Sequence, residues 1–511
     1  MERCKTTLLV VALAVSSVFF ALTSPCADPS SPRNIILVIG DGMGPEAVGL
    51  LIYQNRFTKG LEYRSNLEKL MAKGNTGYCL TYQYGTVVTD SASAATALAC
   101  GVKTRDGMIG KDHDGRAMNS ILDVARARGK STGLISNTRI THATPAGFYA
   151  QVLHRDMESK IAEQLLEGGK VDVALSSGAQ FFVPKGTRVE EHPFLKSTSR
   201  EAGWGISKRD DDVDLLAQFR KRGFAVVASA EELRALDPSS SRVLGLFGAT
   251  AFPLAVDRQP PMGRGIPRLA EMTAKALEIL SKNANGFFLM VEAGQIDWAE
   301  HANDVAAVLH EMLEMDEALG TVLEYAENHP DTLVILTADH DTGGLAVAYN
   351  SHKPPAPLEL PSGETWKSKY NFNEGSIFAL MTGQRKSLFK MALDSKGDPA
   401  SLKREVEQNS AFTITEEQAA AVLAKDPTLG YPAPKEYTHF YVYGAMNPAA
   451  LLGRLFGREL GTAWAVGTHT HTPVMVMATG PKADAFRGLL DNTDIAKIMA
   501  QAWGGSLPSP K

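Results

Sequence analysis

The sequence contains few cysteines, so disulfide bonds contribute little to its fold. Four cysteines occur in 511 residues, and two of these, Cys4 and Cys26, lie close to the amino terminus. The other two, Cys79 and Cys100, can form at most one disulfide, which an oxidising compartment would permit. We expect instead that both side chains are buried as small apolar groups, with Cys100 inside a helix.

The sequence also lacks an excess of positive charge. Its 52 lysines and arginines are outnumbered by 57 aspartates and glutamates, which gives a net charge of −5. No basic patch interleaved with aromatic residues occurs, and this argues against a nucleic acid as a binding partner. With 44% apolar and 21% charged residues, the composition is that of a soluble globular protein. The length permits one large domain with an insertion, or two to three domains.

The single long apolar run stands at the amino terminus. Arg3 and Lys5 precede an apolar stretch over residues 8–22, which is followed by the small residues of 23–27. This is the pattern of a secretory signal peptide, which we assign to residues 1–26. A retained membrane anchor is the alternative, but the run is shorter than the ~20 residues that a membrane span needs. We therefore expect an exported protein without a stable membrane anchor, in the periplasm rather than the extracellular medium.

Three predicted strands each deliver an acidic residue at the same end. Residues 34–39, 286–291 and 332–337 are continuous apolar runs, typical of strands covered on both faces of a parallel sheet. Asp41, Glu292 and Asp339 stand at the carboxyl ends of these runs, where ligands bind in open α/β sheets. Asp41 alone could be an ordinary turn residue, but three such acids indicate one common site.

The remaining pattern predicts an α/β fold around a large, mostly parallel sheet. Further strands are expected at 132–136, 171–175, 224–227, 243–247 and 474–478, with an extended run at 84–88. Helices are expected at 121–128, 269–280, 308–323 and 494–503, and one more is expected to carry Arg155. From 345 to 466 the alternation weakens, with helical patterns only near 416–424 and 448–456. We interpret this segment as an insertion packed over the sheet edge.

Residues 89–97 predict the start of a helix with a reactive side chain. Asp90 is a suitable N-cap, and almost all residues after it are alanine, serine or threonine. Small side chains let other groups approach the helix start, where free backbone N–H groups favour an anion. Ser91 is therefore the candidate nucleophile, although a serine in such a position is usually structural.

Histidines accompany the acids and point to a metal site. Asp297 and His301 are spaced i, i+4, so a helical turn places both on one face. His340 directly follows Asp339. Structural ion pairs could account for one or two of these residues, but the full set predicts convergence on a polyvalent cation.

Six motifs, in this order along the chain, resemble those of the alkaline phosphatases. The motifs are residues 40–44, 89–91, 142–146, 291–297, 337–340 and the segment around His469. The resemblance covers most of 34–344 and 467–505, and it implies a three-layer α/β/α sandwich. We expect 27–344 and 467–511 to form this catalytic domain, with 345–466 as a crown-like insertion over the active-site edge.

The resemblance implies the hydrolysis of phosphate monoesters at alkaline pH through a phosphoserine on Ser91. It implies two zinc ions and one magnesium ion, and it makes Arg155 the residue that binds the phosphate. The implied ligands are Asp297, His301 and His469 for the first zinc ion, Asp41, Asp339 and His340 for the second, and Asp41, Thr144 and Glu292 for magnesium. These residue types suit the ions, since zinc takes imidazole and carboxylate ligands and magnesium takes oxygen ligands.

Two positions depart from the enterobacterial pattern. His142 stands where those enzymes carry aspartate, and Trp298 where they carry lysine, which leaves the identity of the third metal open. We expect both side chains to lie behind the metal ligands, with direct ligation by His142 as the alternative. The last zinc ligand is ambiguous between His469 and His471, because both lie in the run 468–473. Alternate residues of a strand face opposite ways, so we expect only one of them to bind the zinc ion. In the alkaline phosphatase pattern an apolar run leading to Gly-Pro follows the ligand, so the resemblance, counted back from Gly480, favours His469.

Two other functions fit part of the pattern. A phosphodiesterase or sulfatase of the same fold is the nearest, but a sulfatase motif is missing at Ser91, and Arg155 suits a doubly charged monoester. A catalytically silent phosphate- or zinc-binding protein is the second, and turnover of any monoester would exclude it. The resemblance also implies a homodimer that acts on small-molecule phosphate monoesters.

Overall fold

A large sheet forms the centre of the computed structural model, which describes residues 31–198, 205–237, 239–258, 265–426, 429 and 435–508. Within these residues ten strands form one sheet, in the order β16-β2-β15-β8-β1-β7-β3-β4-β6-β5. Their bounds are β1 Asn34–Gly40, β2 Asn75–Leu80, β3 Ser131–Arg139, β4 Val173–Ser177, β5 Ala225–Val227, β6 Val243–Leu246, β7 Phe287–Ala293, β8 Thr332–Ala338, β15 Val474–Thr479 and β16 Gly488–Asp491. Of these ten, only β15 runs antiparallel to its neighbours, β2 and β8.

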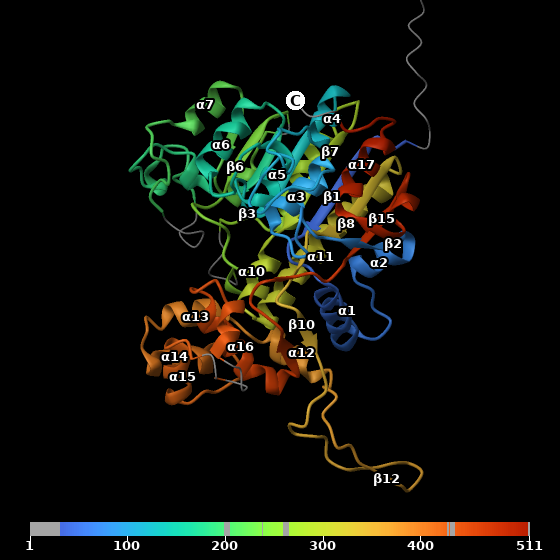
Figure 1. Cartoon of the computed structure of the whole chain (residues 1–511), viewed down its shortest axis with the longest axis vertical. Coiled ribbons are helices and arrows are strands. Elements are labelled where there is room, and N and C mark those ends of the chain that lie inside the picture. The colour runs from blue at the N-terminus through green and yellow to red at the C-terminus, as the bar shows by residue number, and fades with distance from the viewer. Residues whose placement is uncertain are drawn as a thin grey trace, which may run out of the picture.

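Helices cover both faces of the sheet (Figure 1). Packed together on one face are α3 Ser91–Cys100, α4 Ile121–Ala127, α5 Ala143–Tyr149 and α17 Asn492–Ala502. Packed together on the other are α1 Pro45–Lys59, α2 Asn66–Lys73, α9 Leu269–Leu280 and α11 Val305–Asn328. The remaining elements outside 345–466 are α6 Glu158–Glu167, α7 Leu215–Lys221, α8 Ala230–Arg234, α10 Gln295–His301, the short strands β9 Asp341–Thr342 and β14 His469–Thr470, and 3-10 turns at Ala179–Phe181, Val189–Glu191, Ala255–Arg258 and Ala483–Phe486. The predicted three-layer α/β/α sandwich with a mostly parallel sheet is confirmed.

The apolar runs become the central strands because both faces of the sheet are covered there. Every residue of β1, β7 and β8 is buried. Parallel pairing aligns Gly40, the last residue of β1, with Ala293 of β7 and Ala338 of β8. The chain therefore leaves these three strands at one edge, which is where the functional residues lie.

Three details of the prediction are wrong. Strand β4 spans Val173–Ser177 rather than 171–175, and the Asp172 side chain just before it forms an ion pair with Arg126 at 3.0 Å. Residues 84–88 belong to a turn closed by a bridge from Gln83 to Thr86, and not to an extended run. Arg155 lies in the turn between α5 and α6 rather than on a helix.

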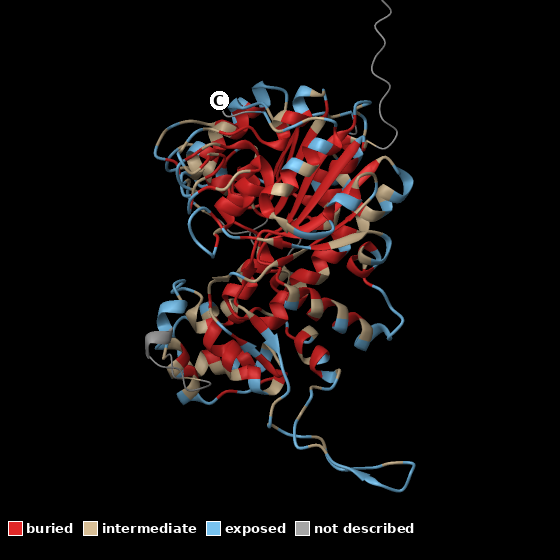
Figure 2. Ribbon diagram, turned by 45° about the vertical axis from the view of Figure 1, so that its right-hand side comes forward, coloured by how far each residue is buried: buried red, intermediate tan, exposed pale blue. Residues whose placement is uncertain are grey.

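Residues 345–466 gather in a lobe beside the carboxyl edge of the sheet (Figures 1 and 2). Its elements are β10 Leu345–Val347, β11 Leu358–Glu359, β12 Thr365–Trp366, α12 Ser376–Thr382, α13 Leu388–Asp394, α14 Pro399–Asn409, α15 Glu416–Leu423, η5 Lys435–Phe440, α16 Asn447–Leu460 and β13 Thr462–Trp464. The helical patterns near 416–424 and 448–456 correspond to α15 and α16. An exposed hairpin containing β11 and β12 extends away from the lobe.

Two buried aspartates attach this lobe to the sandwich. Asp304, the N-cap of α11, accepts hydrogen bonds from the Leu388 backbone N–H at 2.7 Å and from Gln384 Nε2 at 3.0 Å. Asp257 accepts from the backbone N–H and the hydroxyl of Ser387, each at 2.7 Å. The start of α13 is therefore held against the helix that follows the candidate site.

A buried ion pair next to this attachment provides a test of stability. Arg258 forms a salt bridge with Glu314 of α11, and both side chains are less than one tenth exposed. Replacing Arg258 by methionine leaves the Glu314 carboxylate buried without its partner, so we expect a loss of about 3–5 kcal/mol of stability. A denaturant titration of the two proteins measures it. The double variant Arg258→Met, Glu314→Gln should regain much of the loss, and an equal loss in both would contradict this account.

The remaining predictions concern cysteines and the amino terminus. Cys79 and Cys100 are both free and buried, and burial raises the pKa of each thiol to about 12. Among the described residues, no helix combines the length and the apolar character needed to cross a membrane. The proposed signal peptide, residues 1–26, lies outside the described part of the chain.

Candidate active site

The acids and histidines singled out in the sequence meet at the carboxyl edge of the sheet. Glu292 lies near the end of β7, while Asp41 and Asp339 directly follow β1 and β8. In the described part of the chain, ligand atoms lie within 4.8 Å of one another in three groups: Asp297, His301 and His469; Asp41, Asp339 and His340; and Asp41, His142 and Glu292. Asp41 belongs to two of these groups, so the three form one continuous site.

The candidate nucleophile, Ser91, is the first residue of α3 and is almost fully buried. Asp90 is the N-cap of this helix, as predicted, and its carboxylate accepts a hydrogen bond from the Ser93 backbone N–H at 2.9 Å. Ser91 Oγ lies 3.2 Å from His340 Nε2. The serine hydroxyl is therefore placed at the positive end of a helix and beside the second group of ligand residues.

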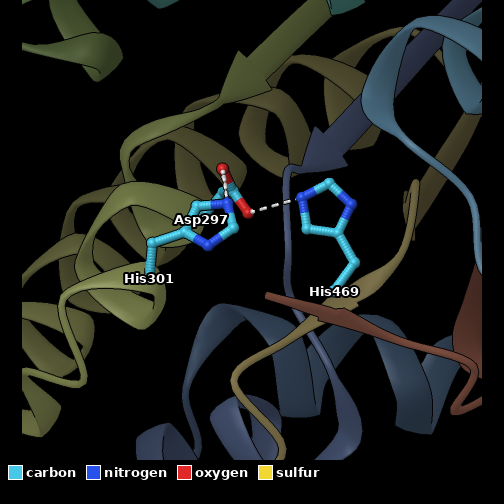
Figure 3. Close-up of side chains that lie close together, drawn as sticks. All are labelled: Asp297, His301 and His469. Atoms are coloured by element: carbon cyan, nitrogen blue, oxygen red, sulfur yellow. Dashed lines mark ion pairs between the residues drawn. The ribbon is translucent and has the colours of Figure 1, made fainter. Parts of the chain in front are cut away.

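The first group joins two residues of α10 with one of β14 (Figure 3). Asp297 lies between the two rings, with 3.3 Å from Oδ2 to His301 Nε2 and 3.6 Å from Oδ1 to His469 Nε2. His301 Nδ1 donates to the Gly467 carbonyl at 2.9 Å, and His469 Nδ1 donates to the Thr89 carbonyl at 2.8 Å. Because the Nδ1 atoms carry the protons, each ring presents a free Nε2 to the centre of the group.

The neighbouring histidine in the sequence does not join this group. His471 is exposed, whereas His469 is largely buried and pairs with Asp297. Of the two alternatives left open by the sequence, the structure thus brings only His469 into reach of Asp297 and His301.

The second group surrounds the imidazole of His340. His340 Nε2 lies 3.3 Å from Asp339 Oδ2 and 3.6 Å from Asp41 Oδ1, and all three side chains are fully buried. Backbone N–H groups of Gly42 and His340 donate to Asp339 Oδ1 at 3.1 and 2.9 Å. These bonds orient the Asp339 carboxylate so that Oδ2 turns toward the histidine.

A threonine that the sequence analysis missed connects the first two groups. Thr342 Oγ1 donates to Asp297 Oδ1 at 2.7 Å and lies 3.2 Å from His340 Nδ1. The side chain is fully buried, so these contacts are shielded from water. No local signal marked this residue, because its role depends on the approach of α10 to β9.

The third group is lined by hydroxyls. Thr144 Oγ1 lies 3.4 Å from Asp41 Oδ2, and Thr138 Oγ1 lies 3.3 Å from Glu292 Oε2. His142 is close enough to Asp41 and Glu292 to count as a member of the group, so the structure keeps both alternatives for this residue. The group is rich in oxygen, which is what magnesium prefers.

Unpartnered polar atoms test whether these groups suit metal ions. Among the described residues, Asp41 Oδ1, Glu292 Oε1, Asp339 Oδ2 and His469 Nε2 are buried and lack any hydrogen-bond partner. A buried carboxylate oxygen without a partner is costly, and a cation would satisfy it. Each of the three groups contains at least one of these unpartnered atoms, so the donor sets fit three neighbouring cations.

Burial and mutual repulsion shift the pKa values of these groups. Burial, followed by the charges of neighbouring carboxylates, raises the pKa of Asp41 and of Asp339 well above the usual range. Burial raises the pKa of Glu292 to about 7 and lowers that of His340. Burial alone would raise the pKa of Asp297 too, but the adjacent imidazoles, His301 first, hold it well below its usual value. Without cations, Asp41, Asp339 and Glu292 therefore retain protons to higher pH than ordinary carboxyl groups, whereas Asp297 stays ionised.

This proton retention predicts a pH dependence in the metal-stripped protein. Glu292 has a pKa of about 7 in the folded protein and an ordinary value of 4.5 when exposed to solvent, so the folded protein binds an extra proton between these pH values. Stability contributed by this group consequently falls as pH rises from 4.5 to about 7. We expect the stripped Glu292→Gln variant to lose less stability over this range than the unsubstituted protein. Denaturant titrations at several pH values compare the two slopes, and equal slopes would contradict the assignment.

Arg155 faces the same space as Ser91. Its Nη1 forms a salt bridge with Asp90 Oδ2 at 3.2 Å, and its Nη2 lies 3.0 Å from His142 Nε2. The His142 ring stands edge-on to Trp298, with 6.2 Å between the ring centroids. Both positions that depart from the enterobacterial pattern thus line the cavity, and His142 contacts the guanidinium directly.

A cavity of about 470 Å³ opens above these groups. Ser91, Arg155 and the three residues of the first group line it, together with Trp298. The sequence analysis did not single out several other lining residues, which are Arg139, Tyr443, Met446, Asp106, Gly107, His154, Asp156 and Glu158. Tyr443 and Met446 come from the weakly patterned segment 345–466, where no motif marked them.

Comparisons with known proteins agree with this site. The family model described as Alkaline phosphatase matches residues 32–504. The chain is 30% identical over 521 residues to Alkaline phosphatase 3 of Bacillus subtilis, with 98% of each chain covered. It is 32% identical over 365 residues to the alkaline phosphatase of Escherichia coli, with 63% of this chain and 73% of that chain covered.

Solved structures show the same likeness. The crystal structure of the Thermus thermophilus alkaline phosphatase has a TM-score of 0.76 at 28% identity, covering 94% of this chain and 93% of that one. The cold-active alkaline phosphatase of a psychrophilic Shewanella species has a TM-score of 0.69 at 28% identity, covering 92% and 99%.

Proposed function

The chain belongs to the alkaline phosphatase family of phosphomonoesterases, and from that premise we propose which of its residues carry out the hydrolysis of phosphate monoesters. The enzyme class and the dependence of the family on metal ions follow from this membership. The residue roles, the identity of the ions and the alkaline pH optimum are the proposal. One observation carries it: Ser91 Oγ lies 3.2 Å from His340 in the second ligand group, and Arg155 lines the same cavity.

Ser91 is the proposed nucleophile. Its oxygen attacks phosphorus in line with the bond to the leaving oxygen, that bond breaks, and the alcohol departs with a proton. Water then attacks the phosphoserine, the Ser91 oxygen regains its proton, and inorganic phosphate leaves. The start of α3 favours negative charge on the serine oxygen, because its backbone N–H groups and helix dipole face that oxygen.

Arg155 is the proposed phosphate-binding residue. A guanidinium presents two parallel N–H donors, which match two oxygens of a phosphoryl group. In the structure one N–H group of Nη1 is directed to Asp90 and Nη2 contacts His142, which leaves a further N–H group on each nitrogen for phosphate. Arg155 is therefore already ordered before the substrate binds, so substrate binding costs little side-chain entropy at this residue.

The three ligand groups are proposed to hold two zinc ions and one magnesium ion. Asp297, His301 and His469 would bind the first zinc ion, Asp41, Asp339 and His340 the second, and Asp41, Thr144 and Glu292 the magnesium ion. When bound, such a pair of metal ions would stabilise negative charge on the attacking and the leaving oxygens. Imidazole and carboxylate donors favour zinc in the first two groups, and oxygen donors favour magnesium in the third.

Turnover of three ester classes tests the proposal. The metal-replete protein is incubated at alkaline pH with an aryl phosphate monoester, the matching diester and the matching sulfate ester. We expect rapid release of phosphate from the monoester and much slower turnover of the other two. Preference for the diester or the sulfate ester would favour another enzyme of the same fold, and no turnover of any ester would leave a binding protein.

Arg155 provides a test of the phosphate site. We expect Arg155→Met to lower kcat/KM for the monoester by about 10²-fold or more, because a charged hydrogen-bond pair to phosphate is lost. The Arg155→Lys variant should recover only part of the loss, since lysine lacks the planar pair of donors. The inhibition constant for inorganic phosphate should rise in parallel, because phosphate binds more weakly. A loss of turnover with unchanged phosphate inhibition would contradict the assignment.

Assembly and location complete the proposal. We propose a homodimer, and the exposed side chains of Tyr349, Tyr370 and Phe372 near the hairpin offer apolar surface that association would bury. Light scattering of the purified protein measures the mass.

We also propose that the chain is exported to the periplasm, on the pattern of its first 26 residues, and cell fractionation tests this. The division into a catalytic domain and an insertion at 345–466 remains part of the proposal.

A further inference from the structure

We propose that Tyr443 forms a subsite for the leaving group of the substrate, and that this subsite favours phosphate monoesters of planar aromatic alcohols. The inference rests on the proposed function. It concerns a residue of the segment 345–466, which the family motifs do not reach.

Tyr443 lies in the loop between η5 and α16, and it lines the cavity that contains Ser91 and Arg155. Its ring centroid is 4.3 Å from that of His301, and the two rings are inclined by 58°. The residue is nonetheless 43% exposed. One part of the aromatic ring therefore contacts the first ligand group, while another part faces open space.

Hydrogen bonds fix this loop to the end of α10. Tyr441 Oη donates to Asn303 Oδ1 at 3.1 Å. Asn303 is fully buried, and its Nδ2 donates to the carbonyls of Glu300 at 2.9 Å and Val466 at 3.1 Å. The Met446 backbone N–H donates to the Tyr443 carbonyl at 2.8 Å. The position of Tyr443 is thus tied to the helix that carries His301.

The direction of the reaction brings the leaving group to this loop. Ser91 is 1% exposed and lies at the base of the cavity, whereas Tyr443 is at its open side. In-line displacement requires the leaving oxygen to depart on the side of phosphorus opposite the attacking serine. With the phosphoryl oxygens held by Arg155, the bond to the alcohol points from the buried base toward Tyr443 and Met446.

The chemistry of the open side selects the kind of alcohol. Tyrosine offers an aromatic face, and a methionine thioether makes favourable contacts with aromatic rings. Asp106, Asp156 and Glu158 also line the cavity, and Arg139 is engaged by Glu158 in a bidentate pair. Carboxylates disfavour an anionic leaving group, so the surface suits an uncharged planar ring better than a further phosphate or carboxylate.

A comparison of two substrates tests the subsite. kcat/KM is measured for phenyl phosphate and for glycerol phosphate in the unsubstituted enzyme and in Tyr443→Ala, Tyr443→Phe and Val442→Ala. For each substrate, kcat/KM of the variant is divided by kcat/KM of the unsubstituted enzyme. This ratio removes the intrinsic reactivity of the leaving group. Val442 serves as the control because it is 64% exposed in the same loop and does not line the cavity.

The expected result is selective. Tyr443→Ala should lower kcat/KM for phenyl phosphate by about 2- to 10-fold, which corresponds to the loss of one aromatic pair interaction. The effect on glycerol phosphate should be smaller. Tyr443→Phe and Val442→Ala should retain the preference. The inhibition constant for inorganic phosphate, which has no leaving group, and the bound zinc content should be unchanged in Tyr443→Ala.

Other outcomes separate the subsite from the proposed function. Equal losses on both substrates, with weaker phosphate inhibition or lower zinc content, would overturn the subsite and make Tyr443 a support for His301. A preference that survives in Tyr443→Ala would overturn it as well. No turnover of either ester by the unsubstituted, metal-replete enzyme would reject the proposed function, and the subsite would fall with it.

Discussion

Removal of metal ions by a chelator is expected to abolish turnover of phosphate monoesters and to lower the thermal unfolding temperature. The ligand groups bring Asp41, Glu292, Asp297 and Asp339 together in one buried site, where unpaired negative charge is costly. Ions that bind only the folded state stabilise it by mass action, so we expect unfolding to occur roughly 3–10 °C lower without them. Calorimetry and a phosphate-release assay before and after chelation measure both effects.

Restoration of ions distinguishes the groups from one another. Zinc alone should restore part of the activity, and zinc with magnesium should restore the remainder. The Glu292→Gln variant, altered only in the oxygen-rich group, should respond to zinc but lose most of the additional effect of magnesium. Activity that survives complete removal of metal, verified by elemental analysis, would contradict the assignment of all three groups.

Replacing Ser91 by alanine is expected to lower turnover by about 10³-fold or more, since the attacking oxygen is lost while the rest of the site remains. The variant should bind inorganic phosphate and retain its metal ions. Acid quenching during turnover of a labelled monoester should leave label on the unsubstituted enzyme and none on Ser91→Ala. This result is sharper than the rate alone, because it reports the covalent step directly.

Ser93→Ala serves as the matched control for the nucleophile. Ser93 is buried two residues further along α3, and it contacts Asp90 without lining the cavity. We expect the control to keep most of the activity and to remain labelled after acid quenching. Labelling of Ser91→Ala at the level of the unsubstituted enzyme would require a different nucleophile.

Local patterns were sufficient for the central strands and the helix of Ser91. The apolar runs of β1, β7 and β8 predict buried strands because both faces of a parallel sheet are covered by helices. Strands β2 and β16 were not predicted from the sequence. Gly77 and Tyr78 interrupt the apolar pattern of β2, and β16 is only four residues long. Strand β2 pairs with β15 and β16 pairs with β2, so both pairings depend on chain that returns near the carboxyl terminus.

The sequence by itself determined the fold class, the family and the residues whose chemistry suits metal ions and phosphate. These follow from the periodicity of apolar residues, from acids at strand ends and from the order of the motifs. Each of these features is visible in short stretches of the sequence. Only the tertiary structure decided that Thr342 links Asp297 to His340 and that Arg155 contacts His142.

The structure also decided that Tyr443, from the least patterned segment, faces the cavity beside His301. Such contacts join residues far apart in the sequence. They form because burying the two faces of the sheet forces the connecting loops to converge at one edge, and no single stretch of sequence encodes where they meet.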